Sequence, residues 1–240
     1  MTLIIKRTIR KAIRVSKVVA GMGAGLGVCW WPYLKRKPQK IYLLPKWLWT
    51  CVFGAPHMAG YPWFSFEAVE WLEKFLKKDM KIFEWGSGGS TSYFAQKVNA
   101  VISVESNPEW YKKVSEVLKK KNITNCQYLL KEPKLSDLPN YPTTDSNYQG
   151  LDFEDYCKTI DGYPDGHFDL VSVDGLARPF CIRHALKKIK PGGFLMLDDS
   201  EQPRHTKGIE ELRALKRQDF TSPKFYIYYC HFVTTWQKPL

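Results

Sequence analysis

Residues 81–91 read KIFEWGSGGST. The apolar residues at its start predict a buried strand, and the glycines after them predict a tight turn into a helix. A second apolar stretch, Ala100–Val104, ends on Glu105, nineteen residues after Gly86. An acid at the tip of a neighbouring strand can accept hydrogen bonds from ribose hydroxyls. Together the two stretches predict a site for a nucleotide-type cofactor.

The spacing of the glycines argues against a dinucleotide. A dinucleotide-binding turn has the pattern G-x-G-x-x-G, in which the third glycine brings helix and strand together. Gly86 and Gly88 fit this pattern, but Thr91 occupies the third position. The turn is instead Glu84-x-Gly86-x-Gly88-Gly89, and it resembles the turn of the class I S-adenosylmethionine-dependent methyltransferases. In that family the turn wraps the methionine part of the cofactor, and the acid after the second strand holds the ribose.

The second half of the chain carries the same resemblance. Residues 168–174 form an apolar run, and a helical stretch follows them. Residues 190–193 read KPGG, which ends a helix because proline cannot continue it and glycine supports the exit turn. A further apolar strand, residues 194–197, ends on two acids, Asp198 and Asp199. This succession resembles the fourth and fifth strands of the methyltransferase fold.

Helix signals separate the predicted strands. Residues 63–78 have helical spacing of apolar positions, with Ser65 as a candidate N-cap. Asn107 is a second N-cap, which starts a helix over residues 110–120, and a third strand is expected around residues 126–130. Strands and helices that alternate in this way predict a parallel sheet with right-handed crossovers.

The resemblance covers the chain from about residue 63 to the C-terminus. It implies an α/β fold, a Rossmann-like doubly wound and mostly parallel seven-stranded sheet with an antiparallel C-terminal strand pair. Two β-rich segments, residues 225–229 and residues 231–236, are the candidates for that pair.

The resemblance also implies a set of cofactor-binding residues at the glycine-rich turn and at the ends of the second and fourth strands. They are Glu84, Trp85, Gly86, Ser87, Gly88, Gly89, Ser90, Thr91, Glu105, Ser106 and Asp174. The implied cofactor is S-adenosyl-L-methionine. The implied activity is methyl transfer, with an oxygen of a small-molecule, glycan or lipid-linked acceptor favoured. Two other functions stay open, namely an NAD(P)-dependent oxidoreductase and a non-catalytic scaffold of the same fold.

Methyl transfer from a sulfonium needs a group that aligns the acceptor and removes its proton. Carboxylates at the carboxyl ends of the strands suit this role, because ligands of open α/β sheets bind there. Asp174 and Asp199 are the first candidates, and His205 is another. In the catechol-type O-methyltransferases, an Asp after the fourth strand and an Asp-Asn pair after the fifth, at positions like Asp174, Asp198 and Asp199, hold a divalent cation. Asp199 stands where that group has Asn, so we favour acids that line the pocket without a metal.

Two features are candidates for substrate binding. Arg178 could bind a carboxylate, a phosphate or a sugar hydroxyl, and it could equally pair with Asp174 or cap its helix. Residues 131–167 break the alternation of strands and helices, which is typical of a lid or binding loop. Tyr141 and Tyr156 in this segment are the expected substrate contacts. The segment could also be an ordinary insertion whose aromatic side chains pack on the body.

Charge is distributed unevenly along the 240 residues. Residues 1–50 hold 11 of the 36 Lys and Arg residues and no acid, so the remainder is nearly neutral, with 25 basic and 24 acidic side chains. An enzyme that acts on nucleic acid more often has a basic stripe beside its active site, so no nucleic-acid partner is expected. The sequence predicts a basic arm over residues 1–54 and a methyltransferase domain over residues 55–240.

The basic arm has the pattern of a segment that contacts a membrane. On a helix, Ile5, Ile9 and Ile13 share one face, and basic residues share the other. The apolar run of residues 18–31 is shorter than the roughly 20 residues that a spanning helix needs. We therefore expect a cytoplasmic protein whose residues 1–40 contact an anionic membrane surface peripherally. A docked leader, an organellar transit peptide and a secretory signal stay open.

The six cysteines are scattered along the chain. They are Cys29, Cys51, Cys126, Cys157, Cys181 and Cys230. Their spacing matches neither a zinc site nor a C-x-x-C motif, so the sequence predicts reduced thiols without a disulfide framework.

Overall fold

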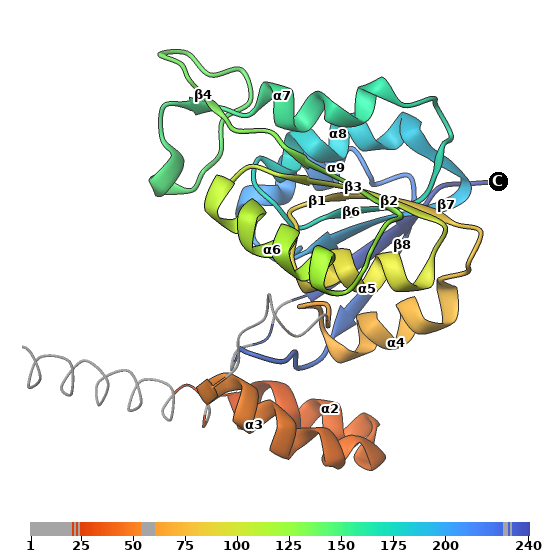
Figure 1. Ribbon diagram of the computed structural model, residues 1–240. Helices are drawn as coiled ribbons and strands as arrows, with labels where there is room; N and C mark the ends of the chain where they lie inside the picture. The colour runs from red at the N-terminus through yellow and green to blue at the C-terminus, as the bar shows by residue number, and fades with distance from the viewer. Residues whose placement is uncertain (1–20, 22, 24, 54–60, 228–229, 231) are drawn as a thin grey trace, which may run out of the picture.

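The computed structural model describes residues 21, 23, 25–53, 61–227, 230 and 232–240. In this part of the chain, seven strands form one sheet in the order β3-β2-β1-β6-β7-β9-β8 (Figure 1). The strands are β1 (Lys81–Trp85), β2 (Ala100–Glu105), β3 (Cys126–Leu130), β6 (Phe168–Val173), β7 (Ile189–Asp198), β8 (Lys216–Thr221) and β9 (Phe232–Gln237). A second, two-stranded sheet pairs β4 (Lys134–Leu135) with β5 (Leu151–Asp152).

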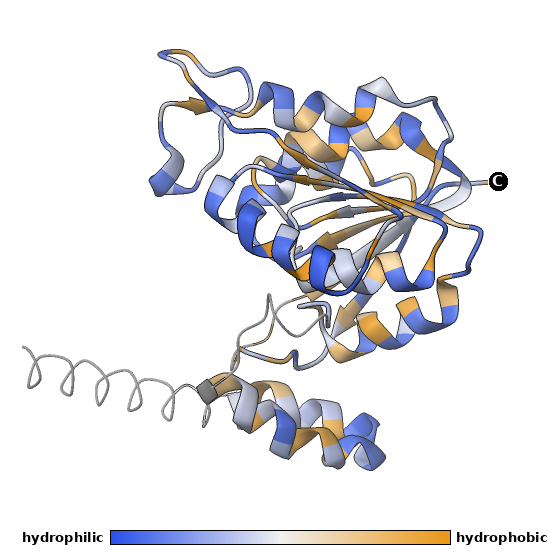
Figure 2. Cartoon of the chain, viewed as in Figure 1, coloured by the Kyte–Doolittle hydropathy of each residue, from blue (hydrophilic) through white to orange (hydrophobic). Residues whose placement is uncertain are grey.

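The first five strands of the large sheet run parallel, and β9 runs antiparallel to both β7 and β8. The doubly wound sheet with an antiparallel C-terminal pair is therefore confirmed. The central strands are mostly apolar because helices cover both of their faces. Figure 2 shows these apolar strands inside the molecule and polar positions on the outer surfaces of the helices.

Helices pack on both faces of the sheet (Figure 1). One side carries α4 (Phe66–Phe75), α5 (Gly89–Lys97) and α6 (Pro108–Lys120), and the other carries α7 (Glu154–Cys157), α8 (Arg178–Lys188) and α9 (Thr206–Glu210). Three short helical turns are η4 (Ser146–Tyr148), η5 (Lys158–Gly162) and η6 (Pro203–His205). Both predicted N-caps are confirmed, since Ser65 Oγ accepts from the amide of Ala68 at 3.4 Å and Asn107 Oδ1 from that of Trp110 at 2.9 Å.

The C-terminal strand pair differs in position from the prediction. The first member is β8, residues 216–221, and residues 225–227 are not a strand. Four of the six residues of β8 are exposed on this edge strand, so its sequence, KRQDFT, lacks an apolar pattern. Phe225 is buried among aromatic rings and does not join the sheet.

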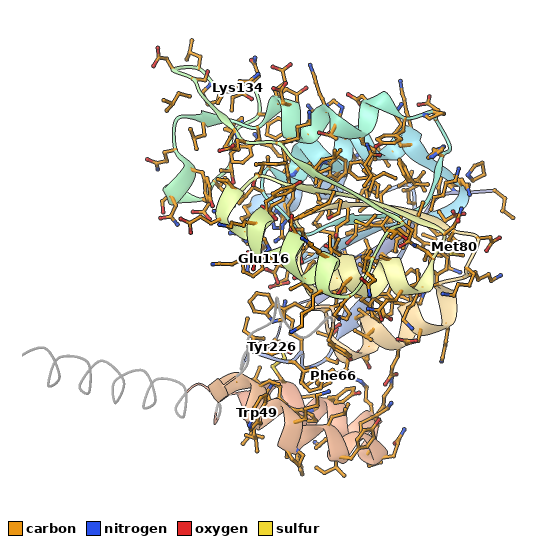
Figure 3. The ribbon with its side chains drawn as sticks, viewed as in Figure 1. Trp49, Phe66, Met80, Glu116, Lys134 and Tyr226 are labelled. Carbon is orange, nitrogen blue, oxygen red and sulfur yellow. A yellow bond between two sulfur atoms is a disulfide. The ribbon has the colours of Figure 1, made fainter. Side chains whose placement is uncertain are left out.

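Residues 26–53 form a helical unit, here called the N-terminal hairpin, that packs beside α4. It contains η1 (Leu26–Trp30), α2 (Trp31–Arg36), η2 (Pro38–Leu43) and α3 (Leu44–Phe53). Trp30, Tyr33 and Trp47 of the hairpin form one buried cluster with Phe66 and Phe225. Figure 3 shows Phe66 where the hairpin meets the sheet domain.

Polar contacts and one disulfide add to this junction. Lys37 and Lys40 both form ion pairs with Glu70, at 2.7 and 2.8 Å. Cys29 and Cys230 form a disulfide, so the prediction that all six thiols are reduced is wrong. The two cysteines lie 201 residues apart, and only the packing of the hairpin against the C-terminal segment brings them together.

The predicted amphipathic helix of residues 5–17 lies outside the described residues. Within the described ranges, every helix is too short or too polar to span a bilayer.

Candidate functional site

The turn after β1 is shaped by contact with the neighbouring strand end. Gly86 has φ +85°, and a Cβ there would lie 2.5 Å from the amide nitrogen of Gly175 and 2.6 Å from the carbonyl carbon of Asp174. Only glycine fits this close approach of two backbones without strain. Gly88 differs, because a Cβ on it would meet no atom within 4 Å. The first glycine is therefore required by the packing of the protein itself.

Two predicted cofactor residues of β1 are buried below this turn. Glu84 accepts hydrogen bonds from Thr91 Oγ1 at 2.6 Å and from Ser103 Oγ at 2.7 Å. Burial raises the pKa of its carboxyl group to about 7, against the opposing effect of these hydroxyls. Trp85 is also fully buried, and its Nε1 donates to the carbonyl of Tyr156 at 2.9 Å. Both side chains hold the turn in place from the interior.

Thr91 occupies the position of the third glycine in a dinucleotide site. Its Oγ1 accepts a hydrogen bond from the amide of Gly88 at 3.0 Å. This amide lies at the start of α5, where a dinucleotide-binding turn would hold a pyrophosphate. Because the Gly88 amide donates to Thr91 Oγ1, it is not available to donate a hydrogen bond to a pyrophosphate.

Glu105 stands at the end of β2, as expected. Its Oε2 accepts from the amide and the hydroxyl of Ser87, at 3.1 and 2.8 Å, and its Oε1 accepts from the amides of Ser106 and Asn107, at 2.8 and 2.9 Å. The carboxylate thus ties the turn after β1 to the loop after β2. The hydroxyl of Ser87 also lies 2.6 Å from that of Tyr128, so it can give up its bond to Glu105 without losing every partner.

A cleft of about 1180 Å³ opens beyond the carboxyl ends of β1, β2, β6 and β7. Its lining includes nine of the candidate site residues: Gly86, Ser87, Glu105, Ser106, Asp174, Arg178, Asp198, Asp199 and His205. Others stay outside the lining, namely Glu84, Trp85, Gly88, Gly89, Ser90, Thr91, Tyr141 and Tyr156. The structure therefore brings the predicted strand-end residues together in one cavity and places the start of α5 behind its wall.

A lysine lies among the acids at the ends of β6 and β7. Lys224 Nζ is 3.1 Å from Asp198 Oδ2 and 3.3 Å from Asp199 Oδ1, and the side chain of Lys224 is only 4% exposed. Burial alone would lower the pKa of Lys224, but the three nearby carboxylates, that of Asp174 included, outweigh it and raise the pKa. An ammonium group thus sits where a divalent cation would bind. In the described part of the chain, no cluster of His, Cys, Asp and Glu has the arrangement of a metal site.

Burial changes the pKa of two of these acids, Asp174 and Asp198. Burial, and then the charge of Asp198, raise the pKa of Asp174. Burial also raises the pKa of Asp198, whose Oδ1 has no hydrogen-bond partner. Asp199 has a left-handed backbone, φ +52°, and its side chain is 19% exposed. Asp199 is therefore the more accessible of the two carboxylates paired with Lys224.

Arg178 connects the ends of two strands. Its guanidinium donates to the carbonyl of Gly175 at 2.8 Å, to that of Asp174 at 3.1 Å and to that of Asp198. It also forms an ion pair with Asp174 at 3.2 Å. Arg178 is only 8% exposed, and its guanidinium is bonded to protein groups. Of the two roles considered for it, the structure shows the one in which it pairs with Asp174.

His205 is buried in the cleft wall and uncharged at neutral pH. Burial, and then the charges of Arg178 and Arg204, lower its pKa to about 3. Its Nε2 accepts from Arg204 Nε at 3.3 Å, and its Nδ1 has no partner.

The lid-like segment contributes to the cleft, but not through the two tyrosines that were expected to contact the substrate. Tyr148 lines the cleft together with residues 142–145. Tyr141 instead packs on α8, where its hydroxyl lies 3.2 Å from Nε2 of His184. Tyr156 is fully buried, with its hydroxyl packed against Gly175. All three are tyrosines of the same segment, and only the folded path of the chain determines which of them reaches the cleft.

Among the cleft residues that sequence reasoning missed are a lysine and two tryptophans. Lys224 follows β8, directly before the segment that was expected to be a strand, and Trp63 lies before α4. Trp110 lines the cleft from α6, and its Nε1 donates to the carbonyl of Ser87 at 2.7 Å. A lysine or tryptophan without a motif around it carries no signal that could have identified it.

Neither a family model nor a curated protein matches the sequence. Solved structures match the fold. A methyltransferase-like protein from Silicibacter pomeroyi is 22% identical with a TM-score of 0.51, over 77% of this chain and 90% of that one. A tRNA methyltransferase from Aquifex aeolicus is 15% identical with a TM-score of 0.51, over 72% and 68%. A protein from Streptococcus mutans, solved in complex with S-adenosylhomocysteine, is 14% identical with a TM-score of 0.50, over 71% and 96%.

At these identities the likeness concerns the fold. The chain has the fold of the class I S-adenosylmethionine-dependent methyltransferases, as its strand order and its antiparallel C-terminal pair already indicate. Of these three proteins, only the one from Aquifex aeolicus is named for what it acts on, tRNA, so the likeness does not identify an acceptor for this chain.

Proposed function

We propose that this protein transfers a methyl group from S-adenosylmethionine to an oxygen of a small-molecule, glycan or lipid-linked acceptor. The observation that carries the proposal is the position of Glu105. Its carboxylate forms part of the cleft wall at the tip of β2, beside the turn after β1. This is where the ribose of a nucleoside cofactor lies in sheets of this topology.

The residues at this end of the cleft fit the cofactor. All four hydrogen bonds that Glu105 accepts come from its own protein, and the bond from the Ser87 hydroxyl is the one that can be released. A ribose hydroxyl would then replace Ser87 Oγ on Glu105 Oε2. The cleft volume of about 1180 Å³ exceeds the upper end of the roughly 300–1,000 Å³ of small-molecule sites, which leaves room for an acceptor.

The acids at the ends of β6 and β7 supply the base. Bound S-adenosylmethionine would supply an electrophilic methyl group, which the acceptor oxygen takes while the sulfur keeps the electron pair of the broken bond. Asp199 accepts the proton of the acceptor hydroxyl, since it is partly exposed in the cleft. Lys224 holds Asp199 and Asp198 in place and balances their charge. His205 is neutral and contributes no charge to the site.

Calorimetric titration with S-adenosylmethionine, S-adenosylhomocysteine and NAD tests the proposal. We expect both sulfur compounds to bind and NAD to bind far more weakly. Glu105→Gln should weaken S-adenosylmethionine at least about tenfold, because hydrogen bonds to a charged group contribute about 1.5–3 kcal/mol. Glu109→Gln is the matched control, since Glu109 lines the cleft but is exposed on α6. Preference for NAD, or no binding of either sulfur compound by the folded protein, would overturn the proposal.

A further inference from the structure

Exposed apolar side chains are concentrated in the N-terminal hairpin. In the described part of the chain, ten large hydrophobic residues are exposed, and six of them lie between residues 26 and 49. They are Leu26, Val28, Trp31, Ile41, Tyr42 and Trp49. Trp31 is 62% exposed and Trp49 60%, although tryptophan is highly buried on average in globular proteins. This density of exposed apolar groups indicates an interaction surface.

Helical spacing places the exposed residues opposite the buried ones. In η1 and α2, Val28, Trp31 and Lys35 are exposed at helical intervals, whereas Trp30 and Tyr33 point into the buried cluster. In η2 and α3, Tyr42 and Trp49 are likewise exposed seven residues apart, while Trp47 is buried. Figure 3 shows Trp49 on the hairpin and Phe66 at its junction with the domain. We call the exposed surface to which Val28, Trp31, Tyr42 and Trp49 contribute the outer face of the hairpin.

The charge around the outer face is positive. The first acid of the chain is Glu67, so residues 1–66 contain only basic charges. Lys35 Nζ lies 5.4 Å from the ring centre of Trp31, and Lys40 Nζ lies 5.9 Å from that of Tyr42. Aromatic rings beside lysines, on a unit without acids, are typical of proteins that sit at the surface of an anionic bilayer.

The contacts of the basic residues favour lipid over nucleic acid as the partner. Arg36 donates to the carbonyl of Thr221 at 2.9 Å and pairs with Glu67, while Lys37 and Lys40 pair with Glu70. In the described hairpin, these three groups are held by acids of the protein, so they do not form the row of cations that successive phosphates of a nucleic acid need. The exposed aliphatic side chains of Val28 and Ile41 have no role in binding nucleic acid, whereas they add to binding at a lipid interface.

We propose that the outer face of the N-terminal hairpin docks onto an anionic lipid bilayer. Trp31, Tyr42 and Trp49 lie at the level of the headgroups, and Lys35 contacts the lipid phosphates. The contact is peripheral, since residues 26–53 are divided into four short elements. It extends the membrane contact expected for residues 1–40 to a folded surface with named residues.

The docked hairpin also contacts a wall of the cleft. Trp47 Nε1 donates to the carbonyl of Ile227 at 2.8 Å, and Ile227 and Lys224 both line the cleft. The disulfide between Cys29 and Cys230 joins the same two segments. The hairpin therefore joins the surface proposed to meet the bilayer to the segment that borders the cleft.

Flotation of the full-length protein with vesicles tests the proposal. The vesicles are pure phosphatidylcholine, or phosphatidylcholine with about one third phosphatidylserine, which gives the surface an anionic potential. We expect binding to the anionic vesicles, and a loss of at least about tenfold in the double variant Trp31→Ala/Trp49→Ala, which corresponds to about 1.4 kcal/mol. Leu135→Ala/Leu138→Ala is the matched control, because these two exposed leucines lie in the lid-like segment. It should float as the wild type does.

Three results would overturn the proposal. One is equal flotation of wild type and the tryptophan double variant, and another is no flotation of the wild type with either vesicle. The third is a dimer that the double variant converts to a monomer, since the outer face would then contact a second copy. Thermal melting of each variant shows whether it is folded. The test involves no methyl transfer, so it stands or falls independently of the enzymatic proposal.

Discussion

Lys224 Nζ and Asp198 Oδ2 lie 3.1 Å apart, and each side chain is only 4% exposed. An ion pair this deeply buried is costly to break, because removal of one partner leaves an uncompensated charge. Lys224→Met should therefore destabilise the protein by about 3–5 kcal/mol. Methyl transfer should fall about 100-fold, because the electrostatic environment of Asp199 changes. Affinity for S-adenosylmethionine should stay near that of the wild type, since Glu105 at the other end of the cleft is untouched.

Urea unfolding, single-turnover methyl transfer and calorimetry measure these three effects separately. Lys216→Met is the matched control, because Lys216 is exposed on the edge strand β8. A Lys224→Met protein that unfolds at the same urea concentration as the wild type would show that the buried pair contributes little.

Removal of Lys224 should also create a preference for a divalent cation. Lys224→Ala leaves Asp198 and Asp199 facing a vacated space, and carboxylate oxygens are the ligands that Mg²⁺ prefers. We expect about 5 mM Mg²⁺ to raise the melting temperature of Lys224→Ala, as any ligand specific to the native state does. The wild type should be unaffected at equal ionic strength, with NaCl as the control salt. An equal shift in both proteins would contradict the role assigned to Lys224.

The two glycines of the turn should respond differently to alanine. In Gly86→Ala the new Cβ meets the backbone of Asp174 and Gly175, and φ is +85°, so we expect a loss of at least about 3 kcal/mol. Gly88→Ala meets no atom within 4 Å, so its stability should change by less than about 1 kcal/mol. Chemical unfolding of both variants makes the comparison. Equal destabilisation by the two changes would contradict the different roles assigned to them.

Glu84 should make the stability depend on pH. Its pKa is raised to about 7 in the folded state, above the ordinary value of 4.5, because it is buried. The folded protein therefore keeps a proton that the unfolded chain loses, and the free energy of unfolding falls as pH rises from about 4.5 to about 7. The decrease amounts to about 3 kcal/mol and ends above pH 7.

Glu84→Gln removes this titration while keeping the size of the side chain. The difference in unfolding free energy between wild type and variant should therefore shrink or reverse as the pH rises through this window. A constant difference from pH 4 to pH 8 would show that Glu84 has an ordinary pKa.

The parallel part of the fold could be predicted because its strands are mostly apolar and are separated by turn and helix signals. Residues 81–85 and 100–105 are marked in this way, and Ser65 and Asn107 mark the helix starts by a local hydrogen bond. These features depend only on neighbours in the sequence. For the same reason, the acids at the strand ends could be assigned to one edge of the sheet.

The remaining features depend on residues far apart in the chain. Lys224 reaches Asp198 only because β8 and β9 fold back beside β7, and β8 itself is too polar to be recognised. The burial of Trp30 and the exposure of Trp31 follow from which face of the hairpin meets α4. The sequence alone does not show which of these two neighbouring tryptophans is buried.

The hydrogen bond from Trp47 Nε1 to the carbonyl of Ile227, at 2.8 Å, connects the hairpin to the segment that carries Lys224. Trp47→Phe keeps an aromatic ring in the cluster but removes this donor, which leaves a carbonyl without its partner. We expect residues 222–227 to exchange amide hydrogens about fivefold faster, as a loss of about 1 kcal/mol in local stability predicts. Trp49→Phe, on the exposed outer face, is the control and should leave this exchange unchanged. If both variants exchange at the wild-type rate, the hydrogen bond from Trp47 does not stabilise residues 222–227, and the proposed link between the hairpin and this wall of the cleft is wrong.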